Sequence, residues 1–262
     1  MRALLTSSGP RAAPTSAVAE IRYKIAENQR ERAAAFRLLH DAYVQAGLML
    51  PNRCRMRVMP HHLLATSAVF VAVQGDRVIS TVSLIGDGQL GLPMECAYRE
   101  EVAQLRSPCR WLGEVSSLAS DRRLSDSQLQ LLGHLTRLMA QYAQRHGLEH
   151  LLAAVHPRHA RFYQRFLGFQ PLGGARPYPG ARHRPSVPLL LDLPQLEQAQ
   201  HPSYLAYFRD PIPDDELRYC TISGADRRFF SLASTNSWLP PFGAAITENG
   251  DSAEGQLQLA IA

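Results

Sequence analysis

The segment WLGEVSSLAS, residues 111–120, places a single carboxylate inside an apolar run. The run predicts a buried strand over Trp111–Ala119, which would carry Glu114 into the protein interior. A carboxylate is rarely buried without either a partner or a chemical role. The segment therefore predicts either a structural ion pair, with Arg110 as the nearest cation, or an accessible proton acceptor at the floor of a slot.

A polar, basic turn with the sequence SDRRLSDS follows this strand, and an amphipathic helix comes next. Backbone N–H groups at a helix start favour negative charge. A strand with one acid, a turn and a helix start are typical of an acyl-transfer site, in which the strand edge and the helix start hold a thioester arm. We expect Glu114 to take a proton from an amine nucleophile. The backbone N–H groups around Ser117–Ala119 are expected either to polarise the thioester carbonyl or to serve in ordinary sheet pairing.

The rest of the chain alternates between strand and helix patterns, which predicts a layered α/β (α+β) fold. The expected strands are Ile21–Ile25, Ala68–Val73, Arg77–Ile85, Trp111–Ala119, His150–Val155, Phe169–Leu172 and Ser186–Leu193. The expected helices are Glu27–Ala46 with Gly47 as its end, Met94–Leu105, a helix that Ser125 or Asp126 caps and Gly147 closes, and a helix from Pro157 to Gly168. Residues 49–66 and 173–185 are expected to form loops.

One domain over residues 20–193 accounts for these elements. The chain has 262 residues, of which 45% are hydrophobic, enough for one sizeable core. Residues 1–19 are rich in Ala, Ser, Pro and Thr, which predicts a disordered leader. Residues 194–262 carry several prolines and a polar tail, and we expect a helical or irregular extension with a mobile end.

The formal net charge of +5 comes almost entirely from arginine, since Lys24 is the only lysine. A basic balance suits an acidic partner: a carrier protein, nucleic acid or an anionic membrane face. The scarcity of lysine and the lack of a basic stripe with interleaved aromatic residues argue against nucleic acid. No apolar run approaches the length of a membrane span.

Four widely spaced cysteines form no CxxC pair, and the adjacent His61 and His62 have side chains that diverge. We therefore expect no metal, and free thiols in a reducing, cytoplasmic environment.

The element order and the segment HARFYQRFLGF resemble the GNAT acyltransferase fold, and three segments resemble the long-chain N-acyl amino acid synthases, relatives of the acyl-homoserine-lactone synthases. These segments begin at HHLLATSAVF, at WLGEVSSLAS and at VHPRHARFYQ, and together run from about residue 61 to residue 180. The resemblance implies a central mixed, mostly antiparallel sheet flanked by helices, with a C-terminal extension. It also implies transfer of a fatty acyl group from an acyl carrier protein thioester to the α-amine of an amino acid.

The resemblance places Glu114 where the autoinducer synthases carry a carboxylate in a similar Trp-Glu-x-Ser-Arg stretch. Ser117 replaces the arginine of that stretch, which argues against S-adenosylmethionine as a substrate. Coenzyme A users of this fold carry a glycine-rich turn where this chain reads Ser120–Ser125 without glycine. The expected donor is therefore the acyl-phosphopantetheine of a carrier protein, as a co-substrate rather than a permanently bound cofactor. The residues expected along its arm are Ser116, Ser117, Leu118, Ala119, Arg122 and Arg123.

Related transferases carry, at the position of Tyr163, a tyrosine that protonates the leaving thiolate; the register also allows Phe162, and core packing is the alternative. Weaker candidates for holding the amino acid substrate are Arg37, Tyr43, His156 and Arg158, although His156 could equally cap a helix. Arg122, Arg123, Arg137 and Arg145 are expected to dock the carrier protein, or else form a solvated face. The candidates for an apolar acyl tunnel are Leu84, Ile85, Leu90, Leu92, Met94, Leu118 and Phe166.

Three other functions remain open at this point. The chain could be a coenzyme A-dependent N-acetyltransferase, for which the turn at Ser120–Ser125 is the discriminating feature. It could be an acyl-homoserine-lactone-type synthase. It could also be a non-catalytic module that binds an acyl carrier or a lipid, in which case side chains should wall in Glu114.

Overall fold

The computed structural model describes residues 20–106 and 111–237, without the side chains of residues 125–127 and 235–237. The expectations for residues 1–19, for Arg110, for a Ser125 or Asp126 cap and for the chain beyond residue 237 lie outside these described parts.

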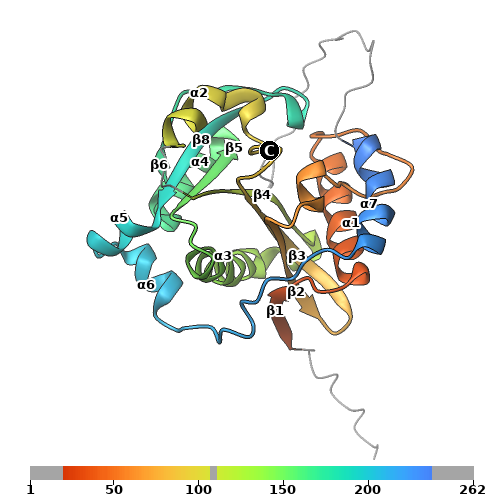
Figure 1. The fold of residues 1–262 in the computed structure, drawn as a ribbon, viewed down its shortest axis with the longest axis horizontal. Helices are drawn as coiled ribbons and strands as arrows, with labels where there is room; N and C mark the ends of the chain where they lie inside the picture. The colour runs from red at the N-terminus through yellow and green to blue at the C-terminus, as the bar shows by residue number, and fades with distance from the viewer. Residues whose placement is uncertain (1–19, 107–110, 238–262) are drawn as a thin grey trace, which may run out of the picture.

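The strands of the described chain form one eight-stranded sheet in the order β1-β2-β3-β4-β5-β8-β6, with β7 paired to β8 (Figure 1). The strands are β1 (Ile21–Ile25), β2 (Ser67–Gln74), β3 (Arg77–Gly86), β4 (Leu112–Ser120), β5 (His150–Val155), β6 (Gln170–Pro171), β7 (Arg176–Tyr178) and β8 (Arg184–Asp192). Every pairing is antiparallel except that of β4 with β5. The mixed, mostly antiparallel sheet of the GNAT-like fold is therefore confirmed.

Helices cover both faces of this sheet. The helices are α1 (Gln29–Gln45), α2 (Glu95–Leu105), α3 (Gln128–Arg145), α4 (Pro157–Leu167), α5 (Leu193–Gln198), α6 (Pro202–Phe208) and α7 (Gly224–Ser237), with short 3₁₀ turns η1 (Pro60–Leu63), η2 (Arg122–Ser127) and η3 (Pro179–Ala181). In Figure 1, α3 lies on one face of the sheet, and α1 and α7 lie on the other. The largest core cluster includes side chains of α3 and α4, and α2 contributes to a third cluster beside β4 and β5.

Local sequence explains where the helices begin and end. The side chain of Asn28 accepts the Glu31 N–H at 2.9 Å, which caps α1, and Gly47 follows that helix at φ 68°. Pro157 stands in the first turn of α4, and Gly168 ends the helix at φ 77°. Gly75 makes the turn between β2 and β3 at φ 58°.

Several expected boundaries were wrong. The strand expected from Trp111 begins at Leu112, and Trp111 is 66% exposed. The loop expected over residues 49–66 contains η1, and the loop expected over residues 173–185 contains β7 followed by η3. These short elements have no periodic pattern of their own, because their conformation depends on pairing with distant strands.

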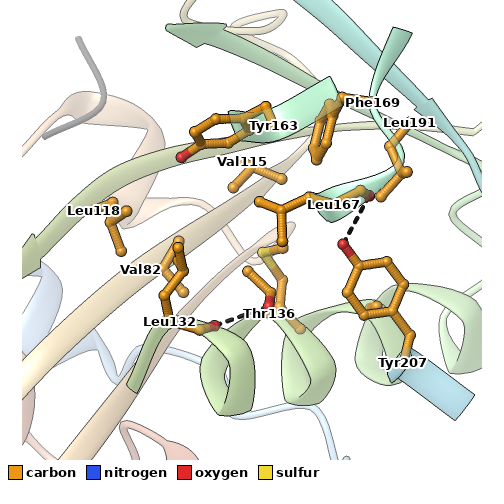
Figure 2. Close-up of a pocket in the computed structure, with 12 residues that line it drawn as sticks. Val82, Val115, Leu118, Leu132, Thr136, Tyr163, Leu167, Phe169, Leu191 and Tyr207 are labelled. Atoms are coloured by element: carbon orange, nitrogen blue, oxygen red, sulfur yellow. Dashed lines mark hydrogen bonds between the residues drawn. The ribbon is translucent and has the colours of Figure 1, made fainter. Parts of the chain in front are cut away.

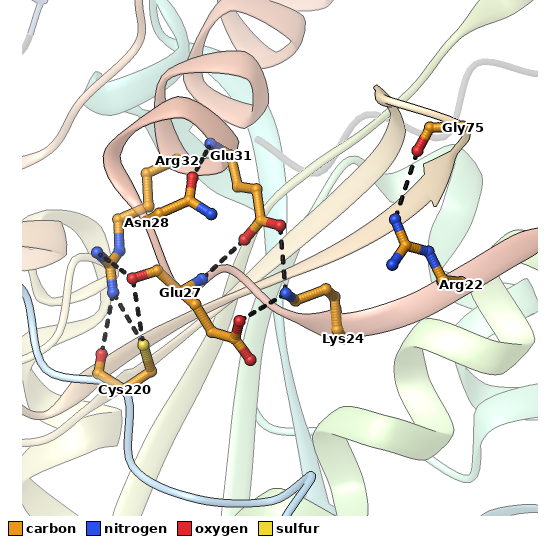
Figure 3. A network of polar contacts seen from close by, with 8 residues as sticks. All are labelled: Arg22, Lys24, Glu27, Asn28, Glu31, Arg32, Gly75 and Cys220. Carbon is orange, nitrogen blue, oxygen red and sulfur yellow. Dashed lines mark hydrogen bonds and ion pairs between the residues drawn. The ribbon is translucent and has the colours of Figure 1, made fainter.

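The C-terminal segment packs onto the core. Phe230 of α7 is fully buried, with its ring edge-on to Phe36 of α1 at 5.2 Å between centroids. The guanidinium of Arg32, also on α1, donates to the carbonyl of Cys220 at 3.1 Å (Figure 3) and lies 3.6 Å from Asp226. The division of the chain at residues 193 and 194 stays a prediction, but α7 is fixed against α1. None of the described helices is both long and apolar enough to cross a membrane.

Candidate active site

The strands β4 and β5 pair only over Leu112–Glu114, opposite His150–Leu152, and they are unpaired beyond that point. Ser117 stands in the left-handed region at φ 56°, where the register between β3 and β4 shifts. A bulge of this kind re-aims the strand. The sheet therefore opens between β4 and β5 immediately after Glu114, as an arm slipped between the two strands would require.

Glu114 is buried, with 1% of its surface exposed, and its Oε2 accepts the backbone N–H of Met94 at 2.7 Å. Burial raises the pKa of this carboxyl to about 8, with a smaller increase from Glu95; the Met94 hydrogen bond and Arg57 act in the opposite direction. No described residue forms an ion pair with it. The expectation of an accessible carboxylate is wrong for this structure, since Glu114 is buried beside the Met94 segment that donates to it.

The side chains around Glu114 come from distant parts of the chain. The guanidinium of Arg57 lies 4.3 Å from the ring centroid of Tyr43, and its Nη2 donates to the carbonyl of Gly180 at 3.4 Å. Burial raises the pKa of both Tyr43 and Tyr178, and Glu114 raises them further, so both hydroxyls stay protonated. Sequence reasoning included Tyr43 but missed Arg57 and Tyr178.

Arg57 carries the same sequence signal that marks Glu114. Its neighbours Met56, Val58 and Met59 are apolar, so a charged side chain stands within an apolar run. The structure buries all of these residues, with Arg57 5% exposed.

A small apolar cavity lies on the opposite face of the sheet, against α3 (Figure 2). Its free space of about 10 Å³ accommodates roughly one water molecule. The residues that line it are Val82, Val115, Leu118, Leu132, Thr136, Met139, Ala140, Tyr163, Leu167, Phe169, Leu191 and Tyr207. Of the expected tunnel residues only Leu118 lines it, while Leu90 and Phe166 are 50% and 60% exposed.

Tyr163, rather than Phe162, belongs to this cavity. It is 2% exposed, and its hydroxyl has no hydrogen-bond partner among the described residues. Burial raises its pKa, and the nearby Tyr43 raises it further. Tyr43 therefore interacts electrostatically both with Tyr163 and with Glu114, which lie on opposite faces of the sheet.

The residues expected along the thioester arm divide into two groups. Ser116, Ser117, Leu118 and Ala119 are buried on β4, and the Ser117 hydroxyl has no hydrogen-bond partner in the described chain. Arg122 and Arg123 are exposed at the turn before α3.

Asp121 occupies the start of that turn. It forms an ion pair with Arg77, and its Oδ1 accepts the Arg123 N–H at 3.0 Å. The Arg123 N–H is therefore already bonded to the carboxylate of Asp121 and is not available to a bound phosphate.

The other candidates lie apart from Glu114. Arg37 and Arg158 are exposed. His156 accepts the Arg158 N–H at 3.3 Å, which is the helix-capping role given above as its alternative. His62 accepts the Met59 N–H at 3.0 Å, and no described group of three or more His, Cys, Asp or Glu side chains could hold a metal ion.

The expected basic docking set is reduced to two residues. Arg137 donates to the carbonyl of Asp210 at 2.7 Å, and Arg145 lies 3.3 Å from Asp214, so both engage the C-terminal segment. In the described chain, Arg122 and Arg123 are the members of this set whose side chains have no partner.

Comparisons with known proteins agree with this geometry. The family model described as "N-acyl amino acid synthase FeeM" matches residues 34–192. The solved structure of FeeM, an N-acyl amino acid synthase from uncultured soil microbes, is similar at 26% identity and a TM-score of 0.62, covering 73% of this chain and 99% of that one. No curated protein matches at a significant level.

Two further solved structures share the fold alone. The acyl-homoserine-lactone synthase LasI matches at 13% identity and a TM-score of 0.55, over 74% of this chain and 96% of its own. TofI, solved with an inhibitor and MTA, matches at 15% identity and a TM-score of 0.50, over 70% and 99%. With a family model that matches more than half of its length, this chain is an N-acyltransferase that belongs to the FeeM N-acyl amino acid synthase family.

Proposed function

We propose that the protein transfers a long-chain fatty acyl group from the phosphopantetheine thioester of acyl carrier protein to the α-amine of an amino acid. The observation that carries the proposal is the position of Glu114, a buried carboxyl with a raised pKa at the last paired residue before β4 and β5 separate. The membership of the FeeM family supports the same reaction.

Aminolysis of a thioester needs a neutral amine, while the α-amine of an amino acid is mostly protonated at neutral pH. The ionised Glu114 carboxylate takes one proton from the ammonium group. Because burial raises the pKa of this carboxyl to about 8, it is a much stronger base than an exposed glutamate. The freed nitrogen then attacks the thioester carbonyl carbon.

This attack forms the C–N bond of the amide, and collapse of the tetrahedral intermediate restores the carbonyl and breaks the C–S bond. The second amine proton ends on the departing sulfur, and the first leaves through Glu114, so the products are an amide, a thiol and one proton. Tyr163 has a protonated hydroxyl without a partner in the described chain, and it donates a hydrogen bond to this sulfur.

The preference for a carrier protein over free coenzyme A follows from Asp121. A pyrophosphate bound at a helix start needs free backbone N–H groups and no competing anion. Here the carboxylate of Asp121 accepts the Arg123 N–H, and Arg122 and Arg123 are exposed beside it. A carrier protein presents an acidic body and a single phosphate, which suits two exposed arginines.

The acyl chain enters the apolar cavity beside α3. Its free space of about 10 Å³ is far too small for a fatty acyl chain, so the side chains that line it must move apart on binding. On the other face of the sheet, the Met94 segment that covers Glu114 must also move to give the amine access to this carboxyl. A carrier-protein donor and free thiols at Cys54, Cys96 and Cys220 support a cytoplasmic location.

The test incubates the purified protein with palmitoyl-acyl carrier protein and mixed amino acids, with amide products detected by mass spectrometry. We expect an N-palmitoyl amino acid, and a loss of about 10²–10⁴-fold in rate for Glu114→Gln. Absence of an amide with every amino acid would overturn the proposed function.

The donor is tested with palmitoyl-coenzyme A in place of the carrier protein. We expect a lower kcat/KM for the coenzyme A donor. The double variant R122E/R123E should lose kcat/KM with the carrier protein and retain it with palmitoyl-pantetheine. Arg30→Glu on α1, 81% exposed at its side chain, is the matched charge control. A coenzyme A donor that equals the carrier protein would overturn the assignment of the donor.

A further inference from the structure

Arg57 is a buried cation with unused hydrogen-bonding capacity. It is 5% exposed, and its Nη1 has no hydrogen-bond partner among the described residues. Within the described chain its guanidinium makes one hydrogen bond, from Nη2 to the carbonyl of Gly180 at 3.4 Å, which is long for a charged donor. A guanidinium carries five N–H donors, and leaving them unused in the interior is costly. A purely structural buried arginine would use more of them.

The loop that carries Arg57 holds the side chain in place. The amide of Asn52 donates to the Met56 carbonyl at 2.8 Å and closes the turn before Arg57. The Arg57 N–H donates to the carbonyl of Phe36 at 2.9 Å, which ties the loop to α1. The Tyr43 ring then supports one face of the guanidinium at 4.3 Å. Three contacts therefore fix a cation whose second terminal nitrogen has no partner in the described structure.

The positive charge of Arg57 acts on Glu114 and lowers the pKa of that carboxyl, although the two side chains form no ion pair. His62, which is also buried, and Tyr178 complete the charged and titratable groups that interact with Arg57. None of these groups supplies a full negative charge within ion-pair distance. The guanidinium of Arg57 therefore has room for an anion as its hydrogen-bond partner.

An α-amino acid carries its carboxylate two bonds from its amine. A group that binds this carboxylate must therefore lie near the base that deprotonates the amine, and Arg57 is buried close enough for its charge to act on Glu114. We propose that Arg57 binds the α-carboxylate of the acceptor amino acid and so presents the amine to Glu114. This inference rests on the proposed function. It assigns Arg57 as the residue that makes the enzyme select amino acids over simple amines.

The test compares two acceptors, the amino acid that the wild-type protein uses best and the primary amide of the same amino acid, which lacks the negative charge. With palmitoyl-acyl carrier protein as donor, we expect the wild type to prefer the acid at least tenfold in kcat/KM. Arg57→Gln should raise KM for the acid at least tenfold and bring the two acceptors within about threefold of each other, the loss expected from removing a charged hydrogen-bond pair. Arg53→Gln, an exposed arginine in the same loop, should behave as the wild type.

Arg57→Lys is the second variant, and it should keep part of the preference because the charge remains. Circular dichroism and thermal unfolding establish that each variant is folded. A preference that survives in Arg57→Gln would overturn the assignment. An equal loss of rate with both acceptors would also overturn it, because that result indicates a role at the thioester carbonyl or in folding. If the wild type acylates no amino acid, the proposed function itself fails, and the role of Arg57 fails with it.

Discussion

The backbone N–H of Met94 donates to Oε2 of Glu114 at 2.7 Å, and this bond joins the start of α2 to the strand β4. It stabilises the ionised carboxylate, and so does the nearby charge of Arg57. Burial acts more strongly in the opposite direction, with the net result that the pKa rises to about 8. The carboxyl is thus a base that ionises just above neutral pH, in a site that a helix start closes.

The first prediction concerns the pH dependence of the reaction. Because only the ionised Glu114 accepts a proton, kcat/KM should rise with pH through a pKa of about 8 and level off above it. The acceptor amine titrates in the same range, so the profile is measured with two acceptors whose amine pKa values differ by more than one unit. The apparent pKa that is the same with both acceptors belongs to Glu114. If that shared pKa lies near the ordinary glutamate value, the prediction is contradicted.

The second prediction concerns stability. A folded-state pKa above the unfolded value of 4.5 means that the folded protein binds more protons than the unfolded chain between pH 4.5 and about 8. The free energy of unfolding of the wild type should therefore fall across this range as the pH rises. Glu114→Gln removes the titration and keeps an acceptor for the Met94 N–H. The free energy of unfolding of the variant minus that of the wild type should therefore increase by several kcal/mol from pH 5 to pH 8.

Urea unfolding of the wild type and of Glu114→Gln at pH 5 and pH 8 measures this difference. The exposed Glu149→Gln is the control, and its stability should follow that of the wild type at both pH values. Parallel curves for the wild type and Glu114→Gln would show that burial does not perturb the carboxyl.

The third prediction separates catalysis from stability at Tyr163. Its hydroxyl is buried without a partner in the described chain, so Tyr163→Phe breaks no hydrogen bond and should leave the free energy of unfolding unchanged or slightly higher. Loss of the donor to the departing sulfur should lower kcat by about ten- to a hundredfold. Tyr207→Phe is the matched control in the same cavity, because its hydroxyl donates to the Leu167 carbonyl at 2.8 Å. That variant should lose about 1 kcal/mol of stability and keep most of kcat, the opposite pattern.

The fourth prediction concerns the helix α7. Phe230→Ala should lower the free energy of unfolding by about 3–5 kcal/mol, since a fully buried ring is removed from its contact with Phe36. Phe229→Ala, at a side chain that is 42% exposed, should cost far less. Chemical denaturation of both variants measures the difference. Equal losses would show that α7 does not stabilise α1.

The order of strands and helices could be predicted because most elements are long and strongly patterned. The helical spacing in α3 reflects burial on one face, while β2 and β3 are largely apolar runs that are buried almost throughout and that meet at the Gly75 turn. The strand β7 and the turn η3 could not be predicted, because three residues of strand depend on a partner and not on their own pattern. Trp111 was expected in a strand because it is apolar, yet single apolar residues are common on protein surfaces.

Glu114 could be identified from the sequence, because a lone carboxylate in an apolar strand is conspicuous. Of its neighbours, only Tyr43 was a candidate, and Arg57 and Tyr178 could not be identified, since these side chains come together only when the loop after α1 and the strand β7 pack near β4. The closed state of the site was also not predictable. It depends on how the segment at Met94 packs, which is a property of the whole tertiary structure.

The packing of Phe230 against Phe36 also bears on how the protein is made. The helix α1 precedes α7 along the chain, so α1 leaves the ribosome before α7 does. Until α7 has been synthesised, one apolar side of α1 has nothing to cover it, and the nascent protein must avoid aggregation through that surface. This side of α1 is therefore covered only after α7 has been synthesised and has folded onto it.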